Sequence, residues 1–585
     1  MLHIALAAAT AWSAPTTATL YVDAAHGDDS NDGSAAHPFQ TAQHCQNQAT
    51  PGTTCVLRAG TYRESISINK NSIAFRADGA AVLSGLDLLD LKWERDTRPC
   101  TWRAALNASV PQLFYDGNMM VEARWPNIYV NNVGDASMSP TAWRKVGDNT
   151  TYGTVHDPAL RTNFSWDGAL ATLNVAHQWN TWTRVVSNHS RSAGTFDYPQ
   201  DLPGLAGYDP ILYPAQAHIW DGCNQAKCNQ YFLSGKLEAL DAPGEWFHDG
   251  ATLYFYPPTC TAPTAAVEVK ARNYAVWVGT AKEDLSFEGL TFQGATLSLK
   301  NCTRCTLTNL TLDHPTYDRE IKELNTPTGH VAATLVAGQH IALKNIVVTQ
   351  SNNNGLLLNG YNVSLDNCVV SYTDWVGALQ YKPLGVIGNQ ISVTRCTVRD
   401  FGNAGITTAI PNVAPAAPGK PQQPPEPMAG RRLEVAYTHI YNGARVGEDT
   451  AALYSGGWAA AGTVWHHNWV HDTTEKCIRF DDQSENATIH HNVIYNCGEP
   501  KFDASSGLNS GLGLVAKGDG HIIYANTIFA ANFSEMCLSS CIEKEKKFRR
   551  QYPRICVIST ADLRCDRGER RRARSSGAAR SVREV

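Results

Sequence analysis

A six-residue unit recurs through the second half of this 585-residue chain and restricts its fold more than any other feature. Its commonest spacings, 20 to 30 residues, equal one coil of a solenoid. Such repeats bury a continuous core only by stacking on one another. The copies are FEGLTF (287), LTNLTL (307), LKNIVV (343), LDNCVV (365), VTRCTV (393), VAYTHI (435), WHHNWV (465), IHHNVI (489) and IYANTI (523).

A second apolar segment follows several units at a constant offset of 12 residues. The pairs are Leu343 and Gly355, Leu365 and Gly377, Val393 and Gly405, and Trp465 and Cys477. Fixed phasing of this kind predicts two parallel sheets that turn at fixed corners. We therefore predict an all-β protein, a right-handed parallel β-helix in which each coil stacks on the one before.

The fourth position of the unit explains residues that otherwise look out of place in a core. Asn468, Asn492 and Asn526 occupy it in the last three copies. At the strand spacing of a β-helix, about 4.8 Å, their amides are expected to bond to one another in a ladder. Their role is therefore structural. Cys368 and Cys396 occupy the same position and are expected to stack inside as free thiols.

Changes in composition and the extent of the repeat divide the chain into five parts. Residues 90–280 are rich in Trp, Tyr and Gly and lack the repeat, and alternating segments such as GEWFHDGATLYFYPP predict an inserted antiparallel β-sandwich-like domain. The Pro-rich stretch 411–430 is either a stiff loop walling a cleft or a disordered excursion. The expected parts are a signal peptide (1–14), an N-terminal cap with first coils (15–89), the insert (90–280), the main β-helix (281–541) and a basic tail (542–585) that is either disordered or a mispredicted gene end.

Cysteines, sequons and charge define the compartment and the class of partner. Sixteen cysteines and nine Asn-x-Ser/Thr sites favour secretion as a disulfide-bonded glycoprotein, with Cys45/Cys55 and Cys223/Cys228 as local bridges. An apolar start that ends in Ser13-Ala14 resembles a secretory signal. No later apolar run is long enough for membrane insertion. Residues 542–585 hold 14 Lys and Arg against 6 Asp and Glu, which leaves an acidic body that argues against nucleic acid.

Charged residues gather on three consecutive coils. In KCIRFDD (476–482), alternation sends Ile478 and Phe480 inward and Arg479 and Asp481 outward, onto a face where charge does not disturb the core. The previous coil carries GEDTAALYSGG and the next carries GLGLVAKGDGH. Stacking is therefore expected to unite these charges in one patch. The residues concerned are Glu448, Asp449, Arg479, Asp481, Asp482 and Lys517.

Two carboxylates on adjacent coils suit glycoside hydrolysis, which uses one as acid and one as nucleophile or base. Lys517 would keep a neighbouring carboxylate ionised, so either Asp481 or Asp482 is expected to be the nucleophile or base. A less compensated Asp449 would be the acid. A polysaccharide lyase, with Lys517 as base and Arg479 neutralising a uronate, is the alternative. A solvated charge network that caps the coil edges is the structural alternative. A non-catalytic glycan-binding or surface β-helix protein is a third functional interpretation.

Weaker candidates have structural explanations. The pairs His466-His467 and His490-His491 are expected to line a corner or cleft rather than hold a metal, and no cofactor is expected. GDDSNDG (27–33) begins like a calcium loop, but Phe39 stands at the twelfth position, so an Asx-rich turn is expected. Trp220 and Trp246 are expected to be buried rather than to stack on sugars.

The chain resembles pectate-lyase-like β-helix proteins through YVDAAHGDDSNDG, PFQT and GTYRE. EARWPN, GEDTAALYSGG and CIRFDDQSENATIHHNVIYN are similar to segments of glycoside hydrolase family 141 and, more distantly, family 120. This resemblance, over about residues 20 to 530, implies a polysaccharide or oligosaccharide substrate, no essential cofactor, and catalytic aspartates at Asp449 and at Asp481 or Asp482. Arg479 departs from the pattern, which usually has an aromatic residue there. The other polar residues, Arg479, Lys517, Glu448, His471 and Tyr454, are expected to bind substrate.

Overall fold

The fold is known from a computed structural model, which describes most of the chain. The described residues are 18–128, 132–147, 149–174, 181–200, 230–321, 333–378, 382–409, 432–447, 449–456, 460–481, 484–498, 511–531, 534–538, 556–559 and 562–565. The expected signal peptide, the Pro-rich stretch 411–430, Cys223, Cys228 and Trp220 lie outside them.

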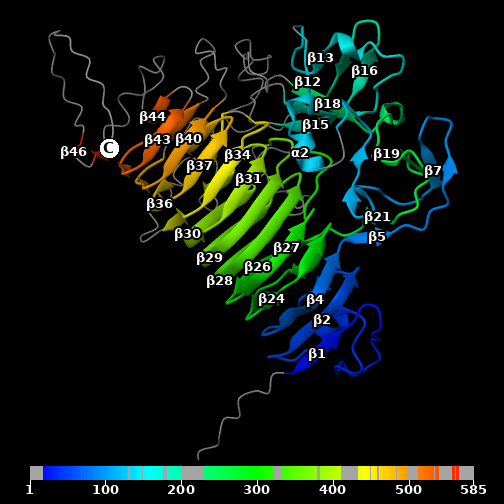
Figure 1. Cartoon of the computed structure of the whole chain (residues 1–585), viewed down its shortest axis with the longest axis horizontal. Helices are drawn as coiled ribbons and strands as arrows, with labels where there is room; N and C mark the ends of the chain where they lie inside the picture. The colour runs from blue at the N-terminus through cyan, green and yellow to red at the C-terminus, as the bar shows by residue number, and fades with distance from the viewer. Residues whose placement is uncertain are drawn as a thin grey trace, which may run out of the picture.

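The described residues form the predicted right-handed parallel β-helix, drawn as a stack of strands from green to orange in Figure 1. Each C-terminal coil has three strands, one in each of three parallel sheets. The first sheet contains β32 (Ile406–Ala409), β35 (Ala451–Ser455), β38 (Lys476–Phe480), β41 (Leu512–Ala516) and β44 (Ser534–Leu538). The second contains β33 (Leu433–Ala436), β36 (Thr463–His466), β39 (Thr488–His490), β42 (Ile522–Tyr524) and β45 (Cys556–Ser559). The third contains β31 (Thr397–Phe401), β34 (His439–Gly443), β37 (Trp469–Thr473), β40 (Val493–Cys497) and β43 (Thr527–Ala531).

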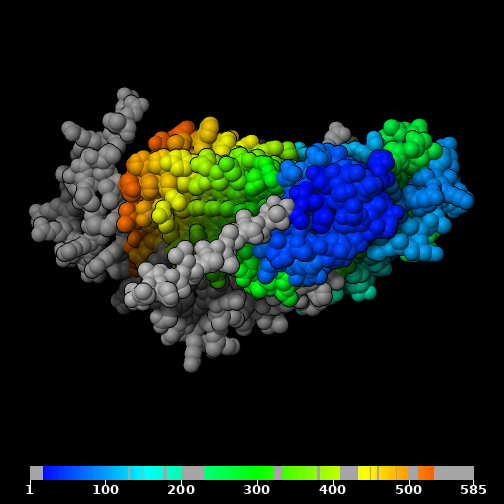
Figure 2. Space-filling model, turned by 90° about the horizontal axis from the view of Figure 1, so that it is seen from below, coloured from blue at the N-terminus to red at the C-terminus, as the bar shows by residue number. Residues whose placement is uncertain are grey.

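The earlier coils contain both short strands and long strands that bend around corners without a break. The short strands are β22 (Tyr274–Val278), β23 (Lys282–Glu283), β24 (Ser286–Glu288) and β25 (Thr291–Gln293), and the long strands are β26 (Thr296–Thr303), β27 (Thr306–Asp313), β28 (Leu335–Ser351), β29 (Leu356–Thr373) and β30 (Leu384–Thr394). The N-terminal coils are β1 (Thr19–Val22), β2 (Thr54–Tyr62), β3 (Ile66–Ser67) and β4 (Ala74–Ser84), with helix α1 (Ala42–Gln48). In space-filling view the coils form parallel bands beside the blue N-terminal residues (Figure 2).

Three sheets replace the two that were predicted, because the repeat unit is a corner and not one strand. The third residue of the unit has a left-handed backbone in all nine copies, from Gly289 (φ 72°) to Ala525 (φ 50°). Asn and Gly are common there because they tolerate this conformation best. Each unit therefore ends one strand of the second sheet and begins one of the third. In three of the four predicted pairs, the segment 12 residues later is the strand of the first sheet, whereas after Leu365 that strand begins only at Leu384.

The asparagine ladder is confirmed. Asn468 donates through Nδ2 to Asn492 Oδ1 at 3.0 Å, and Asn492 donates likewise to Asn526 Oδ1 at 2.9 Å. The second amide hydrogen of each goes to a backbone carbonyl, Val435 O for Asn468 and Trp465 O for Asn492. These interior amides are thus satisfied by one another and by the corner backbone.

We predict that Asn492→Ala lowers the free energy of unfolding by about 3 kcal/mol or more, because the change leaves several buried polar atoms without partners. The backbone N and Nδ2 of Asn468 would both lose their acceptor. Denaturant titration measures the change. Asn118→Ala, at an exposed position that begins the short strand β9 (Asn118–Met119), is the matched control and should stay within about 0.5 kcal/mol of wild type. An equal effect of both changes would contradict a ladder that supports the core.

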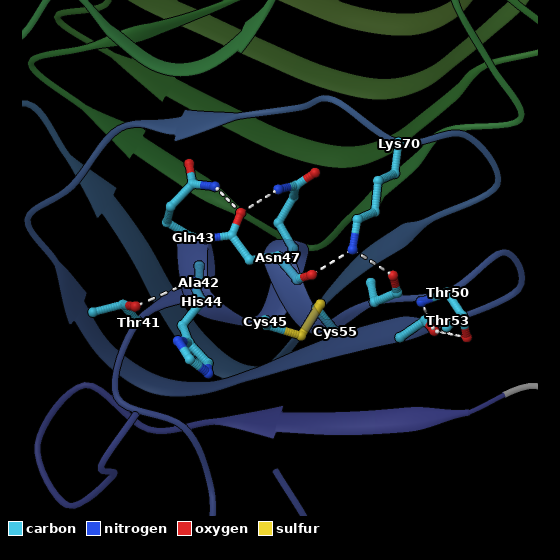
Figure 3. The surroundings of a disulfide bond; sticks show 12 residues. Thr41, Ala42, Gln43, His44, Cys45, Asn47, Thr50, Thr53, Cys55 and Lys70 are labelled. Atoms are coloured by element: carbon cyan, nitrogen blue, oxygen red, sulfur yellow. Dashed lines mark hydrogen bonds between the residues drawn. A yellow bond between two sulfur atoms is a disulfide. The ribbon is translucent and has the colours of Figure 1, made fainter. Parts of the chain in front are cut away.

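Disulfides form both within the solenoid and within the insert. The predicted bridge Cys45–Cys55 is present and joins α1 to β2, as Figure 3 shows. Thr41 caps the start of that helix (Figure 3). Lys70 donates to the carbonyl of Ala49, the residue after its last turn, at 2.8 Å. The other bridges of the described residues are Cys100–Cys260, Cys302–Cys305, Cys368–Cys396 and Cys477–Cys497.

Cys368 and Cys396 correct the expectation of free thiols. They do stack inside on neighbouring coils, but a Cα–Cα distance of 4.4 Å also lets them bond covalently. We predict that neither is alkylated in denaturant unless the protein is first reduced, and that a peptide map without reduction contains their cross-linked peptides. Labelling of both before reduction would restore the thiol interpretation.

The insert leaves the solenoid after β4 and returns at β22. The coil after it stacks directly on the coil before it, since β24 and β25 pair with β4. It is built mainly of antiparallel sheets, seen at the upper right of Figure 1. Its elements are β5 (Leu86–Leu88), β6 (Glu94–Arg95), β7 (Trp102–Ala105), β8 (Leu113–Tyr115), β9 (Asn118–Met119), β10 (Val121–Glu122), β11 (Arg124–Trp125), α2 (Val133–Ser137), β12 (Arg144–Lys145), β13 (Thr154–His156), β14 (Leu170–Asn174), β15 (Trp182–Val185), β16 (Ser187–Ser190), β17 (Thr195–Asp197), β18 (Gln230–Ser234), β19 (Glu245–His248), β20 (Thr252–Phe255) and β21 (Val267–Lys270).

Ion pairs dock the insert on the solenoid. Glu122 accepts from Arg319 at 2.7 Å, and Asp135 from Arg445 at 2.6 Å. Trp246 is buried in the insert, as expected. None of the helices in the described part of the chain is both long and apolar enough to cross a membrane.

The basic tail departs in part from the expectation of a structureless end. Strand β45 pairs in parallel with β42, and β46 (Asp562–Cys565) pairs antiparallel with β45. The rest of residues 542–585 lies outside the described residues.

Candidate functional site

Arg479 lies at the middle of β38 in the first sheet, in register with Tyr454 of β35 and Val515 of β41. Its side chain points away from the solenoid core, as alternation predicts, but only 6% of that side chain is exposed. The expectation of a solvated outer face is therefore wrong at this residue. A buried cation requires compensating negative charge in contact with it.

Two aspartates supply that charge from two coils. Arg479 Nη1 lies 2.7 Å from Asp449 Oδ1 and also donates to the Asp449 carbonyl at 2.8 Å. Arg479 Nη2 donates to Asp481 at 2.8 Å. One guanidinium group thus bridges both carboxylates. We call Asp449, Tyr454, Lys476, Arg479, Asp481 and Lys517 the first-sheet cluster.

Asp481 collects further contacts that favour its ionised form. Lys517 Nζ lies 2.9 Å away, and the Tyr454 hydroxyl donates to Oδ2 at 2.9 Å. Burial alone would raise the pKa of Asp481, but the charges of Arg479 and Lys517 outweigh it and hold that pKa below its usual value of 3.8. Burial, together with the negative charge of Asp481, raises the pKa of the Tyr454 hydroxyl. Asp481 is therefore a carboxylate and Tyr454 a hydroxyl donor at neutral pH.

Asp449 is less isolated than its sequence context indicated. Besides Arg479, it contacts Lys476 Nζ at 3.4 Å, and Lys476 in turn contacts Glu475 at 3.1 Å. The premise that Asp449 is poorly compensated is therefore wrong. Its side chain is 35% exposed, however, against 17% for Asp481. Asp449 is the carboxylate of the pair that solvent reaches more easily.

Lys476 and Glu475 were missed by the sequence interpretation. Both are buried, with 4% and 2% of their surface exposed. A Glu-Lys pair at the start of a strand is ordinarily solvated, so the sequence gives no local signal of its burial.

Of the remaining predicted site residues, the structure describes only His471, and it does not join the cluster. Glu448 and Asp482 lie outside the described residues. His471 lies on β37 in the third sheet, stacked between Tyr441 and Tyr495 with ring centroids 5.4 and 4.5 Å away. Its Nδ1 contacts Asp472 at 2.7 Å and its Nε2 contacts His439 at 2.7 Å. The structure thus places His471 in an aromatic row on another sheet.

The histidine pairs line a corner, as expected. His466 stacks on His490 and His467 on His491, each with ring centroids 4.9 Å apart. Among the residues that the structure describes, no group of three or more His, Cys, Asp or Glu side chains is arranged to hold a metal ion. The segment 27–33 forms Asx turns, in which Asp28 accepts from Ser30 N and Asp32 from Ser34 N.

The chain is similar in part to several known proteins. No family model matches the chain. It is 33% identical over 82 residues to the uncharacterized protein YwoF of Bacillus subtilis (strain 168), a match that spans 13% of this chain and 17% of that protein. A solved glycoside hydrolase shares 16% identity at a TM-score of 0.47, covering 88% of this chain and 89% of its own. The complex of XylC with xylose (10%, 0.39, covering 87% and 69%) and pectate lyase Pel9A (10%, 0.31, covering 89% and 78%) are also similar.

Proposed function

We propose that the protein is a secreted glycoside hydrolase that cleaves a polysaccharide or oligosaccharide with Asp449 and Asp481 of the first-sheet cluster. The observation that carries the proposal is the bridging of two aspartates from adjacent coils by one buried arginine. Paired carboxylates are the usual apparatus of glycosidic bond hydrolysis. The resemblance to family 141 points to the same pair.

The distance between the carboxylates fits this chemistry. Both hydrogen bonds originate from one guanidinium group, so the two contacted oxygens lie within about 8 Å of each other. Glycosidases separate their carboxyl groups by about 5 to 9.5 Å. At such a separation, one aspartate can reach the glycosidic oxygen while the other acts at the anomeric carbon.

The two aspartates are expected to have different roles because their surroundings differ. Three side chains, those of Arg479, Lys517 and Tyr454, stabilise charge on Asp481. Asp481 is accordingly the nucleophile or base. Asp449 takes the role of the acid that protonates the leaving oxygen, and its greater exposure leaves its carboxyl group open to the substrate. Arg479 remains between the two aspartates and balances the charge that moves from one to the other.

The same contacts disfavour lyase chemistry at this cluster. A lysine acts as base only when it is neutral, and the ion pair with Asp481 keeps Lys517 protonated. Arg479 already contacts two carboxylates, so a substrate uronate would have to displace one of them. The hydrolase is therefore the better-supported assignment.

The test is incubation of the secreted protein with a panel of plant and algal polysaccharides. We expect new reducing ends without the ultraviolet absorbance of an unsaturated sugar. Absorbance that grows with the reducing ends would instead identify a lyase. Binding of a polysaccharide without any product would identify a glycan-binding module and overturn the proposal.

A further inference from the structure

A cavity of about 80 Å³ lies between the insert and the solenoid. The insert contributes Val121, Arg124 and Phe232 to its wall, and the solenoid contributes Tyr317 and Trp375. No residue of the first-sheet cluster is among the described residues that line it. Most of the wall is apolar, with a few polar groups in it, and small-molecule sites have this composition and often lie where two domains meet. We call this space the interface cavity.

Arg124 is a buried cation in the wall of the interface cavity. It is 5% exposed, as Arg479 is. Arg479 is held between two aspartates, whereas Arg124 forms no ion pair within the part of the chain that the structure describes. Its Nε donates to Pro126 O at 3.0 Å and its Nη2 donates to Ala142 O, which leaves Nη1 without an acceptor among the described residues. Burying a charge without a partner is costly, so a bound anion would stabilise this arginine.

The nearest groups do not replace an ion pair. The Phe232 ring lies 3.8 Å from the guanidinium carbon, and an aromatic face attracts a cation less strongly than a carboxylate does. Glu245 accepts from the backbone N of Arg124 at 3.2 Å, and burial raises the pKa of Glu245 to about 8, so most of this group is uncharged at neutral pH. Burial also lowers the pKa of Arg124, to about 9, which still leaves it a cation at neutral pH.

Tyr317 supplies a second donor to the interface cavity. Its hydroxyl forms no hydrogen bond with the residues that the structure describes, and burial raises its pKa, so it keeps its proton. Other charged groups of the wall already have partners. Glu122 accepts from Arg319 at 2.7 and 2.8 Å, and Asp318 accepts from Glu320 N at 3.0 Å. Arg124 and Tyr317 therefore both have donors left for a ligand.

We propose that the interface cavity binds a carboxylate, with Arg124 Nη1 donating to one of its oxygens and the Tyr317 hydroxyl donating to the carboxylate as well. Arginine is well suited to this role, because its N–H groups match the geometry of a carboxylate. This site is separate from the first-sheet cluster and does not depend on the proposed hydrolase activity.

The size of the interface cavity limits what it can enclose. A cavity of about 150 Å³ holds benzene, so one of about 80 Å³ has room for about four non-hydrogen atoms. Acetate has this size. The carboxylate end of a uronic acid would also fit, with the sugar ring outside. Both ligands present the same group to Arg124, and the experiment distinguishes them.

The experiment is calorimetric titration of the full-length protein with sodium acetate and, separately, with sodium glucuronate, at constant ionic strength in a chloride buffer. Acetamide has the shape of acetate without its charge and should bind about 100-fold more weakly than acetate, or not at all. Tighter binding of acetate than of glucuronate would assign the site to free short-chain acids. Tighter binding of glucuronate would assign it to acidic sugars.

Two variants connect this binding to the interface cavity. Tyr317→Phe removes one hydroxyl and should weaken carboxylate binding about 10-fold. Arg124→Gln removes the cation and should weaken it about 100-fold or more. Tyr361→Phe is the matched control, since Tyr361 is 40% exposed on β29 and its hydroxyl should not affect binding.

A thermal melt of each variant separates a loss of binding from a loss of fold. Tyr317→Phe retains the aromatic ring and tests the site even if Arg124→Gln does not fold. Three results would overturn the site: neither acetate nor glucuronate binds, acetamide binds as tightly as acetate, or Tyr317→Phe binds the carboxylate with wild-type affinity.

Discussion

Replacing Asp481 with asparagine is expected to reduce glycan hydrolysis by about 10³-fold or more while the protein remains folded. Asparagine keeps the shape of the side chain: its one carbonyl oxygen can still accept from Arg479, and its amide nitrogen can donate to the Tyr454 oxygen. It cannot act as a nucleophile or take a proton from water. Initial rates of reducing-end release, with circular dichroism as the check on folding, measure the effect.

Asp366→Asn is the matched control for that change. Asp366 is also paired with an arginine, Arg395, but lies outside the first-sheet cluster. The Asp366→Asn change should leave the rate of glycan hydrolysis within about twofold of wild type, because it breaks only a surface ion pair. Asp481→Asn with undiminished activity would remove Asp481 from the reaction and leave Asp482 as the candidate.

Arg479→Met is expected to lower the free energy of unfolding by about 3 to 5 kcal/mol, because it leaves Asp449 and Asp481 facing each other without the cation between them. Methionine retains much of the apolar volume, so loss of charge dominates. Differential scanning calorimetry measures the change. Arg479→Lys keeps the positive charge but cannot contact Asp449 and Asp481 at the same time. Its free energy of unfolding should therefore lie between those of wild type and Arg479→Met.

The same substitution has a pH signature. In wild type the pKa of Asp481 is depressed, so its contribution to stability is complete above the usual carboxyl value and is lost as the pH falls through the lower folded value. Without Arg479 that pKa rises, and the acid limb of the pH–rate profile should move to higher pH. An Arg479→Met variant with unchanged stability and an unchanged acid limb would show that Arg479 does not hold the pair.

Sequence alone predicted the solenoid because its repeat is set by stacking. A residue such as Asn492 must match its neighbours one coil away, and that match appears as a fixed phase in the chain. The number of sheets was harder to predict. The bend at residues such as His467 comes from a left-handed backbone, which apolar periodicity does not record.

The candidate site likewise has features that the sequence predicted and features that it did not. Stacking brought Asp449, Arg479, Asp481 and Lys517 together as predicted, since they occupy neighbouring coils. Burial of Arg479 and the contact of Lys476 with Asp449 could not be inferred, because both depend on how loops and the outer face are covered. His471 was misplaced because closeness in sequence to β38 does not put it on the same sheet.

The central claim is hydrolysis through this carboxylate pair, and mass spectrometry of products formed in ¹⁸O-enriched water tests it most directly. Hydrolysis by wild type should place one solvent oxygen at each new reducing end, and Asp449→Asn and Asp481→Asn should form no labelled product on the same timescale. Products lighter by one water and free of solvent oxygen, or labelled products from both variants at the wild-type rate, would contradict the account.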